Sequence, residues 1–237
     1  MNRPPASPFS DPAGTWNRRF EGEEFLFGTA PNTWLVEHAG LFRPGQRVLS
    51  VADGEGRNSV WLAGRGLEVD AFDIAEAGVA KARRFAAEHG AAVNFAVSDC
   101  DGYAWPREYY DAVAAIFVQF ADPPMRERLF ARMIECLKPG GVLVLQGYTP
   151  KQLEYRTGGP PIASHLYTLD MLRAAFAAMK IVELRKYEAT LAEGAGHCGR
   201  SALVGLVARR PGPDPAAKGK AGRKRQEIAF SKNPDAH

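Results

Sequence analysis

One short stretch, residues 47–58, constrains the fold of this chain more than any other. It reads RVLSVADGEGRN, an apolar and β-branched run that ends in a loop with two glycines, and a helix-forming run follows at once. This order predicts a buried strand, a tight turn and a helix. Because glycine lacks Cβ, the backbone at Gly54 and Gly56 can turn sharply and let a ligand approach closely. The free N–H groups of the next helix then face the carboxyl end of the strand, where open α/β sheets bind nucleotides.

The loop does not fit two familiar phosphate-binding patterns. A dinucleotide fingerprint needs a third glycine three residues after Gly56, where this chain has Ser59. A Walker A loop needs Gly-Lys-Ser or Gly-Lys-Thr, which does not occur. A strand–turn–helix corner that binds nothing remains open as the alternative.

A carboxylate at the end of the next expected strand points to a nucleoside. Asp73 follows Gly56 by 17 residues, and an acidic side chain about 20 residues after such a loop can accept hydrogen bonds from both ribose hydroxyls. Several nucleoside-binding families share this device, so it indicates a nucleoside without saying which one. The alternative is that Asp73 caps the helix expected over residues 75–89.

The rest of the chain continues the alternation of strands and helices. Further strands are expected at residues 92–97, 110–118, 142–146, 181–191 and 201–209. A helix with one apolar stripe is expected to start at Pro123-Pro124. The polar stretch 147–167 has the length of a lid or a substrate loop.

Taken together, these signals resemble the class I S-adenosylmethionine-dependent methyltransferases. That family usually reads Asp-x-Gly-x-Gly-x-Gly across the first turn, and here Ser50 stands at the acidic position and Ala52 at the first glycine. Residues 27–32 match an aromatic-Gly-x-x-Pro-Asn segment that precedes the first strand in small-molecule methyltransferases of the tellurite-resistance type. The Leu-Lys-Pro-Gly-Gly run at 137–141, after Tyr-Asp at 110–111, is another frequent signature.

The resemblance implies a fold and a domain organisation. The expected fold is a single Rossmann-like, doubly wound α/β domain with a seven-stranded sheet in the order 3-2-1-4-5-7-6, the last strand antiparallel. An N-terminal aromatic helical flap is expected to cover it, either as a lid or as simple core packing. The domain is expected to span residues 16–210, between a disordered segment 1–15 and a disordered basic tail 211–237.

The resemblance also implies S-adenosyl-L-methionine as the cofactor and S-adenosyl-L-homocysteine as its product. The expected cofactor-binding residues are Trp34, Ala52, Asp53, Gly54, Gly56, Asn58, Asp73, Ile74, Asp99, Cys100, Asp101, Phe117 and Phe120. Asp53 is expected to compensate for Ser50 at the amino end of the methionine, or else the backbone holds that end. Asp99 is expected to accept from the adenine amino group, with Cys100 beside it and Asp101 as the alternate.

Methyl transfer needs little acid–base machinery, because the sulfonium is already activated and alignment supplies most of the rate. His197 is the expected general base, since it stands between two glycines in the last hairpin and histidine titrates near neutral pH. Arg200 is expected to bind an anionic group of the substrate. The alternatives are a structural hairpin histidine and a surface arginine. No metal is expected, because no ligands have metal spacing.

Composition limits which binding partners and which cellular compartment we expect. The net charge of +3 falls in residues 211–237, so the body is neutral and neither nucleic acid nor a membrane is an expected partner. Three cysteines without Cys-x-x-Cys spacing, and an N-terminus without an apolar run, indicate the cytoplasm. The expected partner is a small-molecule methyl acceptor, with thiols and selenium or tellurium oxyanions favoured, and the expected state is a monomer or homodimer.

Two other functions remain open. A non-catalytic S-adenosylmethionine-binding regulatory module would keep the cofactor pocket and lose the substrate pocket. A nicotinamide-dependent oxidoreductase would share Asp73, but it should also show the third glycine and a Tyr-x-x-x-Lys or similar hydride-handling pattern, and both are missing.

Overall fold

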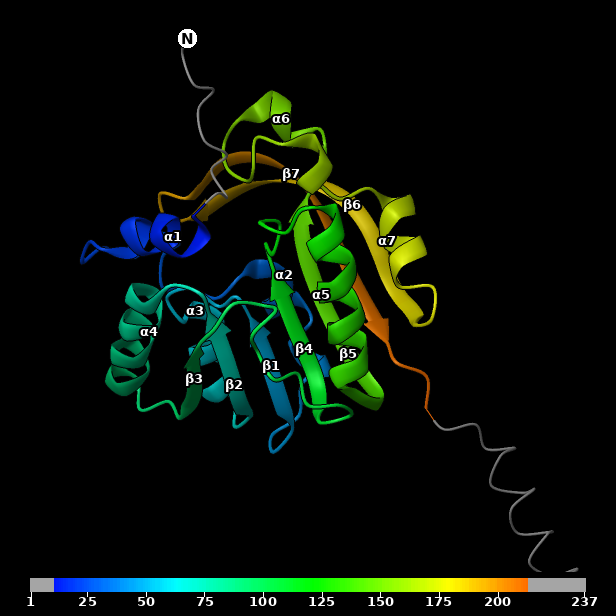
Figure 1. Ribbon diagram of the computed structural model, residues 1–237, viewed down its shortest axis with the longest axis horizontal. Helices are drawn as coiled ribbons and strands as arrows, with labels where there is room; N and C mark the ends of the chain where they lie inside the picture. The colour runs from blue at the N-terminus through cyan, green and yellow to red at the C-terminus, as the bar shows by residue number, and fades with distance from the viewer. Residues whose placement is uncertain (1–10, 213–237) are drawn as a thin grey trace, which may run out of the picture.

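A single seven-stranded sheet organises the molecule (Figure 1). The computed structural model describes residues 11–212 of the chain. The strand order is β3-β2-β1-β4-β5-β7-β6. Strands β1 to β5 pair in parallel, and β7 runs antiparallel to both β5 and β6. The expected Rossmann-like fold, its strand order and its antiparallel last strand are confirmed.

The elements alternate along the chain as the sequence predicts. The strands are β1 (Arg47–Val51), β2 (Glu68–Asp73), β3 (Val93–Val97), β4 (Tyr110–Ile116), β5 (Leu137–Tyr148), β6 (Lys180–Glu193) and β7 (His197–Arg209). The helices are α1 (Pro12–Phe20), α2 (Thr33–Glu37), α3 (Arg57–Ala63), α4 (Glu76–Glu88), α5 (Pro123–Cys136), α6 (Gln152–Tyr155) and α7 (Leu169–Ala175), with 3-10 turns η1 (Ala39–Leu41) and η2 (Ala163–His165).

Both faces of the sheet are covered, and different helices cover each. On one face Leu49 of β1 packs in a cluster with Phe130 of α5 and with Phe176 at the end of α7. On the other face Val48 packs with Leu62 of α3 and with residues of α2. Because successive side chains of a strand point to opposite faces, one strand contributes to both clusters. Burial on both sides explains why β1 and β4 read as nearly continuous apolar runs.

The carboxyl edge of the parallel strands is roofed by segments from both ends of the described chain. Figure 1 shows β6 and β7 curving over this edge toward α1. The tip of their hairpin meets the segment between α1 and α2, where the Gly196 N–H donates to the Leu26 carbonyl at 2.9 Å. In α1, Phe20 is buried, and Asn17 accepts a hydrogen bond from the Ala77 N–H at 2.9 Å. The roof therefore joins parts of the chain that lie far apart in sequence.

Two boundaries differ from the sequence-based expectation. Helix α1 begins at Pro12, capped by Asp11, so residues 12–15 are helical and the expected disordered segment 1–15 was too long. Residues 1–10, and residues 213–237 of the expected tail, lie outside the described residues. Within residues 11–212, no helix combines the length and the apolar character needed to cross a membrane.

Gly56 supports the first turn by its backbone and by its lack of a side chain. It precedes α3 with φ +93°, in the left-handed region. A Cβ placed on it would lie 2.8 Å from the Ala82 Cβ in α4. The close packing of α4 against this loop therefore requires glycine here.

We expect Gly56→Ala to lower the free energy of unfolding by about 2–3 kcal/mol, because it adds left-handed strain and a steric clash. Urea unfolding followed by circular dichroism measures this. The matched control is Gly22→Ala, where the added Cβ has nothing within 4 Å, and we expect a change within about 0.5 kcal/mol. Equal stabilities for the two variants would contradict the role given to Gly56.

Candidate functional site

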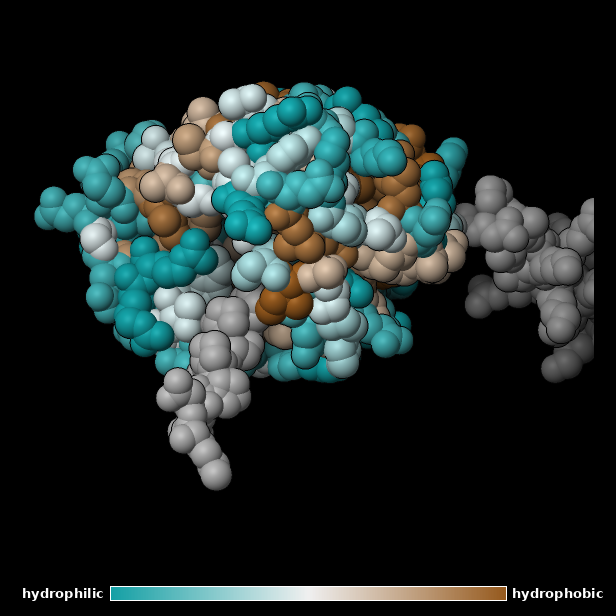
Figure 2. All heavy atoms as spheres, turned by 90° about the horizontal axis from the view of Figure 1, so that it is seen from above, coloured by the Kyte–Doolittle hydropathy of each residue, from teal (hydrophilic) through white to brown (hydrophobic). Residues whose placement is uncertain are grey.

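A cavity of about 800 Å³ lies over the carboxyl ends of the parallel strands. Its floor comes from the ends of β1, β2, β3 and β4, and its roof comes from α1, the β6–β7 hairpin and residues 159–161. In Figure 2, which views the molecule from above, hydrophobic side chains gather toward the middle of the upper face and hydrophilic ones dominate its rim. This is the edge at which open α/β sheets bind their ligands.

Most of the residues singled out from the sequence line this cavity. They are Ala52, Asp53, Gly54, Asn58, Asp73, Ile74, Asp99, Cys100, Asp101, Phe117, Phe120 and His197. Ala52 and Phe117 have φ of +49° and +57°, unusual for residues other than glycine. Such backbone strain is often found at functional sites, and here it occurs where β1 and β4 end and the cavity begins.

Three residues do not line the cavity. Gly56 is turned toward α4 and shapes the loop from behind. Trp34 is buried beneath the sheet, with its ring 5.7 Å from the Tyr187 ring in a stacked arrangement. Arg200 lies on the exposed side of β7, where its guanidinium pairs with Glu188 at 2.7 Å. The structure therefore does not bring Trp34 or Arg200 to the site.

Asp73 is held in place by the backbone of two loops. Its Oδ2 accepts from the Gly54 N–H at 2.9 Å, and its Oδ1 accepts from the Ala75 N–H at 2.8 Å. The capping alternative is wrong, because Ala75 stands at the N-cap of α4 and no side chain caps that helix. Each carboxylate oxygen can accept a second hydrogen bond, so Asp73 keeps acceptor capacity for a ligand in the cavity.

Asp53 and Asp73 have unusual acidities. The Asp53 carboxylate accepts from the Ser50 hydroxyl at 2.6 Å and from the Ser59 hydroxyl. Burial raises the pKa of Asp53 to about 6, and the hydrogen bonds from the two serines only partly offset it. Burial likewise raises the pKa of Asp73 to about 6. The negative charge of Asp73 also raises the pKa of Asp53, and that of Glu55 raises the pKa of Asp73.

His197 lines the cavity from the β6–β7 hairpin, inside an aromatic cluster. Its ring centroid lies 4.4 Å from that of Phe27, 4.2 Å from that of Phe117 and 5.7 Å from that of Tyr148. Its Nδ1 is 3.6 Å from Glu193 Oε2, too far for a hydrogen bond. Burial lowers the pKa of His197, so the ring is neutral at pH 7.

A buried polar network links this part of the cavity to the first loop. Arg57, which follows the loop, pairs with Glu193 of the hairpin at 2.8 Å, and both side chains are almost fully buried. Asn32 donates from its side chain to Glu193 at 3.0 Å and to Gln146 of β5 at 2.6 Å. The Asn32 N–H donates to the Asn58 side chain at 2.9 Å. Four separate segments are therefore joined at and behind the cavity wall.

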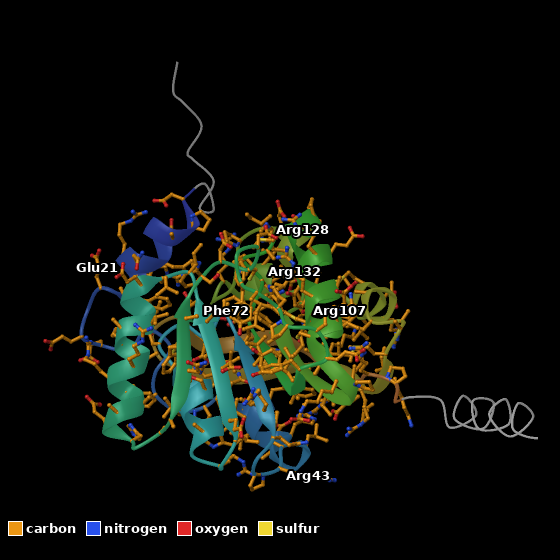
Figure 3. All side chains as sticks on the ribbon, turned by 60° about the horizontal axis from the view of Figure 1, so that its bottom comes forward. Glu21, Arg43, Phe72, Arg107, Arg128 and Arg132 are labelled. Atoms are coloured by element: carbon orange, nitrogen blue, oxygen red, sulfur yellow. The ribbon has the colours of Figure 1, made fainter. Side chains whose placement is uncertain are left out.

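The loop after β3 is held by arginines from α5. Asp101 pairs with Arg128 at 2.9 Å and with Arg132 at 2.7 Å. Figure 3 shows both arginines on α5, on the side toward Phe72 and the β2–β3 part of the sheet. These ion pairs lower the pKa of Asp101. Asp101 thus has two arginine partners. The Asp99 carboxylate accepts one hydrogen bond, from the Gly102 N–H at 2.5 Å.

Several residues that line the cavity were not predicted as site residues from the sequence. Trp16, Arg19 and Phe27 come from the flap, and Tyr148 comes from the end of β5. Residues 159–161 come from the long polar stretch, which was expected to supply a lid or substrate loop. The aromatic richness of the flap was the available signal for the first group, but it did not distinguish which side chains face inward.

Comparison with known proteins finds a family match for part of this chain. Residues 48–141 match the family model described as a methyltransferase domain. This match begins in β1 and ends in β5, so it covers the strands that form the floor of the cavity.

One curated protein and several solved structures are similar to this chain. Over 180 residues it is 26% identical to phosphoethanolamine N-methyltransferase 2 of Caenorhabditis elegans, covering 70% of this chain and only 40% of that protein's length. A structure reported for the conversion of a disulfide bond into a thioacetal group during echinomycin biosynthesis has a TM-score of 0.69 at 18% identity, covering 90% of this chain and 98% of that one.

Two further structures share the fold. TehB from Haemophilus influenzae has a TM-score of 0.62 at 16% identity, covering 84% of this chain and 66% of its own. Phosphoethanolamine N-methyltransferase 2 of Haemonchus contortus, in complex with phosphomonomethylethanolamine and S-adenosylhomocysteine, has a TM-score of 0.61 at 18% identity, covering 86% of this chain and 58% of its own. At these identities the likeness is one of fold.

The raised pKa values of Asp53 and Asp73 make the stability of the protein depend on pH in a specific direction. Because the folded pKa of Asp53 lies near 6 rather than 3.8, folding takes up a proton between about pH 4 and pH 6. The stability that this proton contributes is therefore present below about pH 4 and is lost as the pH rises through 6. We compare the free energy of unfolding of Asp53→Asn with that of the natural protein at each pH. We expect the difference to shift in favour of the variant by about 1–3 kcal/mol between pH 4.5 and 7.5.

Urea unfolding at a series of pH values measures this difference. The matched control is Asp170→Asn, whose side chain is 96% exposed, and its stability relative to the natural protein should vary little with pH. The same pH dependence in both variants would contradict the raised pKa of Asp53.

Proposed function

We propose that this chain is a class I S-adenosylmethionine-dependent methyltransferase and that it transfers a methyl group from S-adenosylmethionine to a small-molecule acceptor. The match of residues 48–141 to a methyltransferase domain supports this proposal. The observation that carries this proposal is the single cavity that runs from the Asp73 carboxylate to the His197 ring. One end offers acceptors for a nucleoside, and the other offers a base within an aromatic enclosure. A cavity of about 800 Å³ has room for a cofactor and a small acceptor together.

The residues at the nucleoside end fit the cofactor. Asp73 has acceptor capacity left for two ribose hydroxyls. Asp99 and Cys100, after β3, stand where an adenine would lie, with Ile74 as an apolar neighbour. Phe117 and Phe120, after β4, wall the site on its other side. Asp53 also shapes the loop, because its carboxylate accepts from Ser50 of β1 and from Ser59 of α3.

The bound cofactor supplies an electrophilic methyl group on its sulfonium. The residues of the chain then have two tasks: to align the acceptor with that methyl group and to keep water out. Phe27, Phe117 and Tyr148 form an apolar enclosure around His197. His197 Nε2 has no hydrogen bond to any residue within 11–212, so it can accept the proton of an acceptor's hydroxyl or thiol.

Glu193 stabilises the product of that proton transfer. Its carboxylate lies 3.6 Å from His197 Nδ1, so it can attract the imidazolium that forms. Arg57 and Asn32 hold this carboxylate in place. A small shift of the His197 ring would convert the present contact into a charge-assisted hydrogen bond.

Acceptors with a soft or small nucleophile fit this end of the site. Thiols remain the favoured class, because a neutral histidine can remove a thiol proton and the surrounding walls are aromatic and apolar. The relatives named for phosphoethanolamine suggest amines and phosphorylated amines as a second class to assay. The cytoplasmic location, the monomeric or homodimeric state and the end of the domain at residue 210 remain predictions from the sequence.

We expect Asp73→Asn to weaken binding of S-adenosylhomocysteine by about 10- to 100-fold, because the ribose loses a charged acceptor. Isothermal titration calorimetry of the full chain measures this. The matched control is Asp70→Asn on the same strand, whose side chain bonds Asn94 away from the cavity, and its affinity should stay within about twofold. Unchanged affinity in Asp73→Asn would remove Asp73 from the site.

We expect His197→Asn to lower kcat by about 100-fold or more with thiol acceptors, because the general base is lost. Affinity for S-adenosylhomocysteine should stay within about threefold, since the residue acts at the other end of the cavity. Formation of S-adenosylhomocysteine with a panel of thiols, phenols, amines and oxyanions provides the assay. The control His38→Asn alters a histidine that bonds Glu183 outside the cavity and should retain full turnover.

The same panel tests the non-catalytic alternative. A regulatory module would bind S-adenosylmethionine with the dependence on Asp73 described above, yet it would turn over none of the acceptors. Turnover of any acceptor that is lost in His197→Asn favours the enzyme.

A further inference from the structure

Arg19 is the one arginine on the cavity wall that has no acidic partner among residues 11–212. Arg57 is neutralised by Glu193, and Arg128 is neutralised by Asp101. Arg19 lines the same cavity, and no ion pair joins it to a described residue. A cation that faces a partly enclosed cavity without a counter-ion is a site for an anion.

Aromatic rings fix the guanidinium of Arg19. It lies 4.4 Å from the ring centroid of Trp16 and 5.8 Å from that of Phe27. Stacking of this kind uses the flat face of a guanidinium and leaves its N–H edge free to bind a carboxylate through two hydrogen bonds. The neighbouring Arg18 differs, because it pairs with Asp11 and does not line the cavity.

The helix that carries Arg19 is anchored over the first loop. The next residue, Phe20, is buried, and its ring lies 3.3 Å from the position that a Cβ of Gly54 would occupy. Asn17 ties the same helix to the start of α4. Glu21, the next acidic residue, is exposed at the outer end of α1 (Figure 3). Arg19 is therefore positioned above the loop and not above the adenine end.

The orientation of the cofactor brings its own anion to this place. With the ribose at Asp73 and the adenine beyond it near Asp99, the methionine part must extend the other way, past Gly54 and beneath α1. That part ends in an α-carboxylate. The neighbouring floor carries Asp53 and Asp73, which repel an anion, so a cation is needed to hold it.

We propose that Arg19 binds the α-carboxylate of S-adenosylmethionine and S-adenosylhomocysteine, with Trp16 and Phe27 holding the guanidinium plane. This inference rests on the proposed function for the orientation of the cofactor. It makes Arg19 a specificity-determining residue, because the chain then distinguishes the complete cofactor from adenosyl compounds that lack the carboxylate. It also couples the position of α1 to the cofactor, since binding places a charge-assisted contact between the flap and the ligand.

The test uses two ligands that differ in the carboxylate alone, S-adenosylmethionine and decarboxylated S-adenosylmethionine. Calorimetry is carried out on the full natural chain, on Arg19→Gln and on Arg19→Lys. We expect Arg19→Gln to bind S-adenosylmethionine about 10- to 100-fold more weakly, as expected for loss of charged hydrogen bonds. The decarboxylated ligand should bind this variant as tightly as the natural chain or more tightly. Arg19→Lys should lose less affinity for S-adenosylmethionine, because lysine keeps the positive charge but lacks the two parallel N–H donors of a guanidinium.

The control variant is Arg18→Gln, which changes a neighbouring arginine outside the cavity and should leave both affinities within about twofold. Equal weakening of both ligands in Arg19→Gln would show that Arg19 only supports the flap, and it would overturn the proposal. Unchanged affinity for S-adenosylmethionine would overturn it as well. If the natural chain bound neither ligand, the proposed function would fail, and this inference would fail with it.

Discussion

The buried ion pair between Arg57 and Glu193 holds the site together. These residues are 136 positions apart in the chain, yet their side chains meet at 2.8 Å and are almost completely removed from solvent. Removing one partner from such a pair typically costs about 3–5 kcal/mol, because it leaves a buried charge uncompensated. Arg57 begins the helix after the first loop, and Glu193 ends β6. The pair therefore fixes the β6–β7 hairpin over the carboxyl edge of the sheet.

Charged groups are distributed unevenly around the cavity. Around Glu193 the charges are balanced by Arg57, and His197 is surrounded by aromatic rings. At the other end Asp53 and Asp73 are crowded together in a poorly solvated floor, and burial raises the pKa of both. A ligand that brings hydroxyl donors to the floor relieves part of this cost, because it stabilises the ionised carboxylates. The two parts of the cavity therefore differ in polarity, as the proposed nucleoside and the proposed acceptor do.

Much of the floor could be predicted from the sequence, and much of the roof could not. Gly54 and Asp73 are recognisable because they are close in sequence and follow strands whose apolar runs are plain. Trp34 and Arg200 show the limit of this reasoning. The motif around Trp34 was correctly placed before β1, but whether its ring faces the cavity or the core depends on the packing of α2 beneath the sheet. Arg200 shares a strand with His197, yet its side chain faces solvent and pairs with Glu188.

The sequence by itself determined the strands, the first loop and a nucleoside-binding carboxylate, because these follow from local patterns of apolar residues, glycines and acidic residues. The strand order and the class of cofactor came from the family resemblance that those patterns carry. Only the tertiary structure decided which residues enclose His197, because Phe27 lies after α1, Phe117 after β4 and Tyr148 at the end of β5, which are distant in sequence. Their meeting depends on side-chain contacts such as that of Glu193 with Asn32 at 3.0 Å. No local pattern encodes such contacts, since each partner alone reads as an ordinary polar residue.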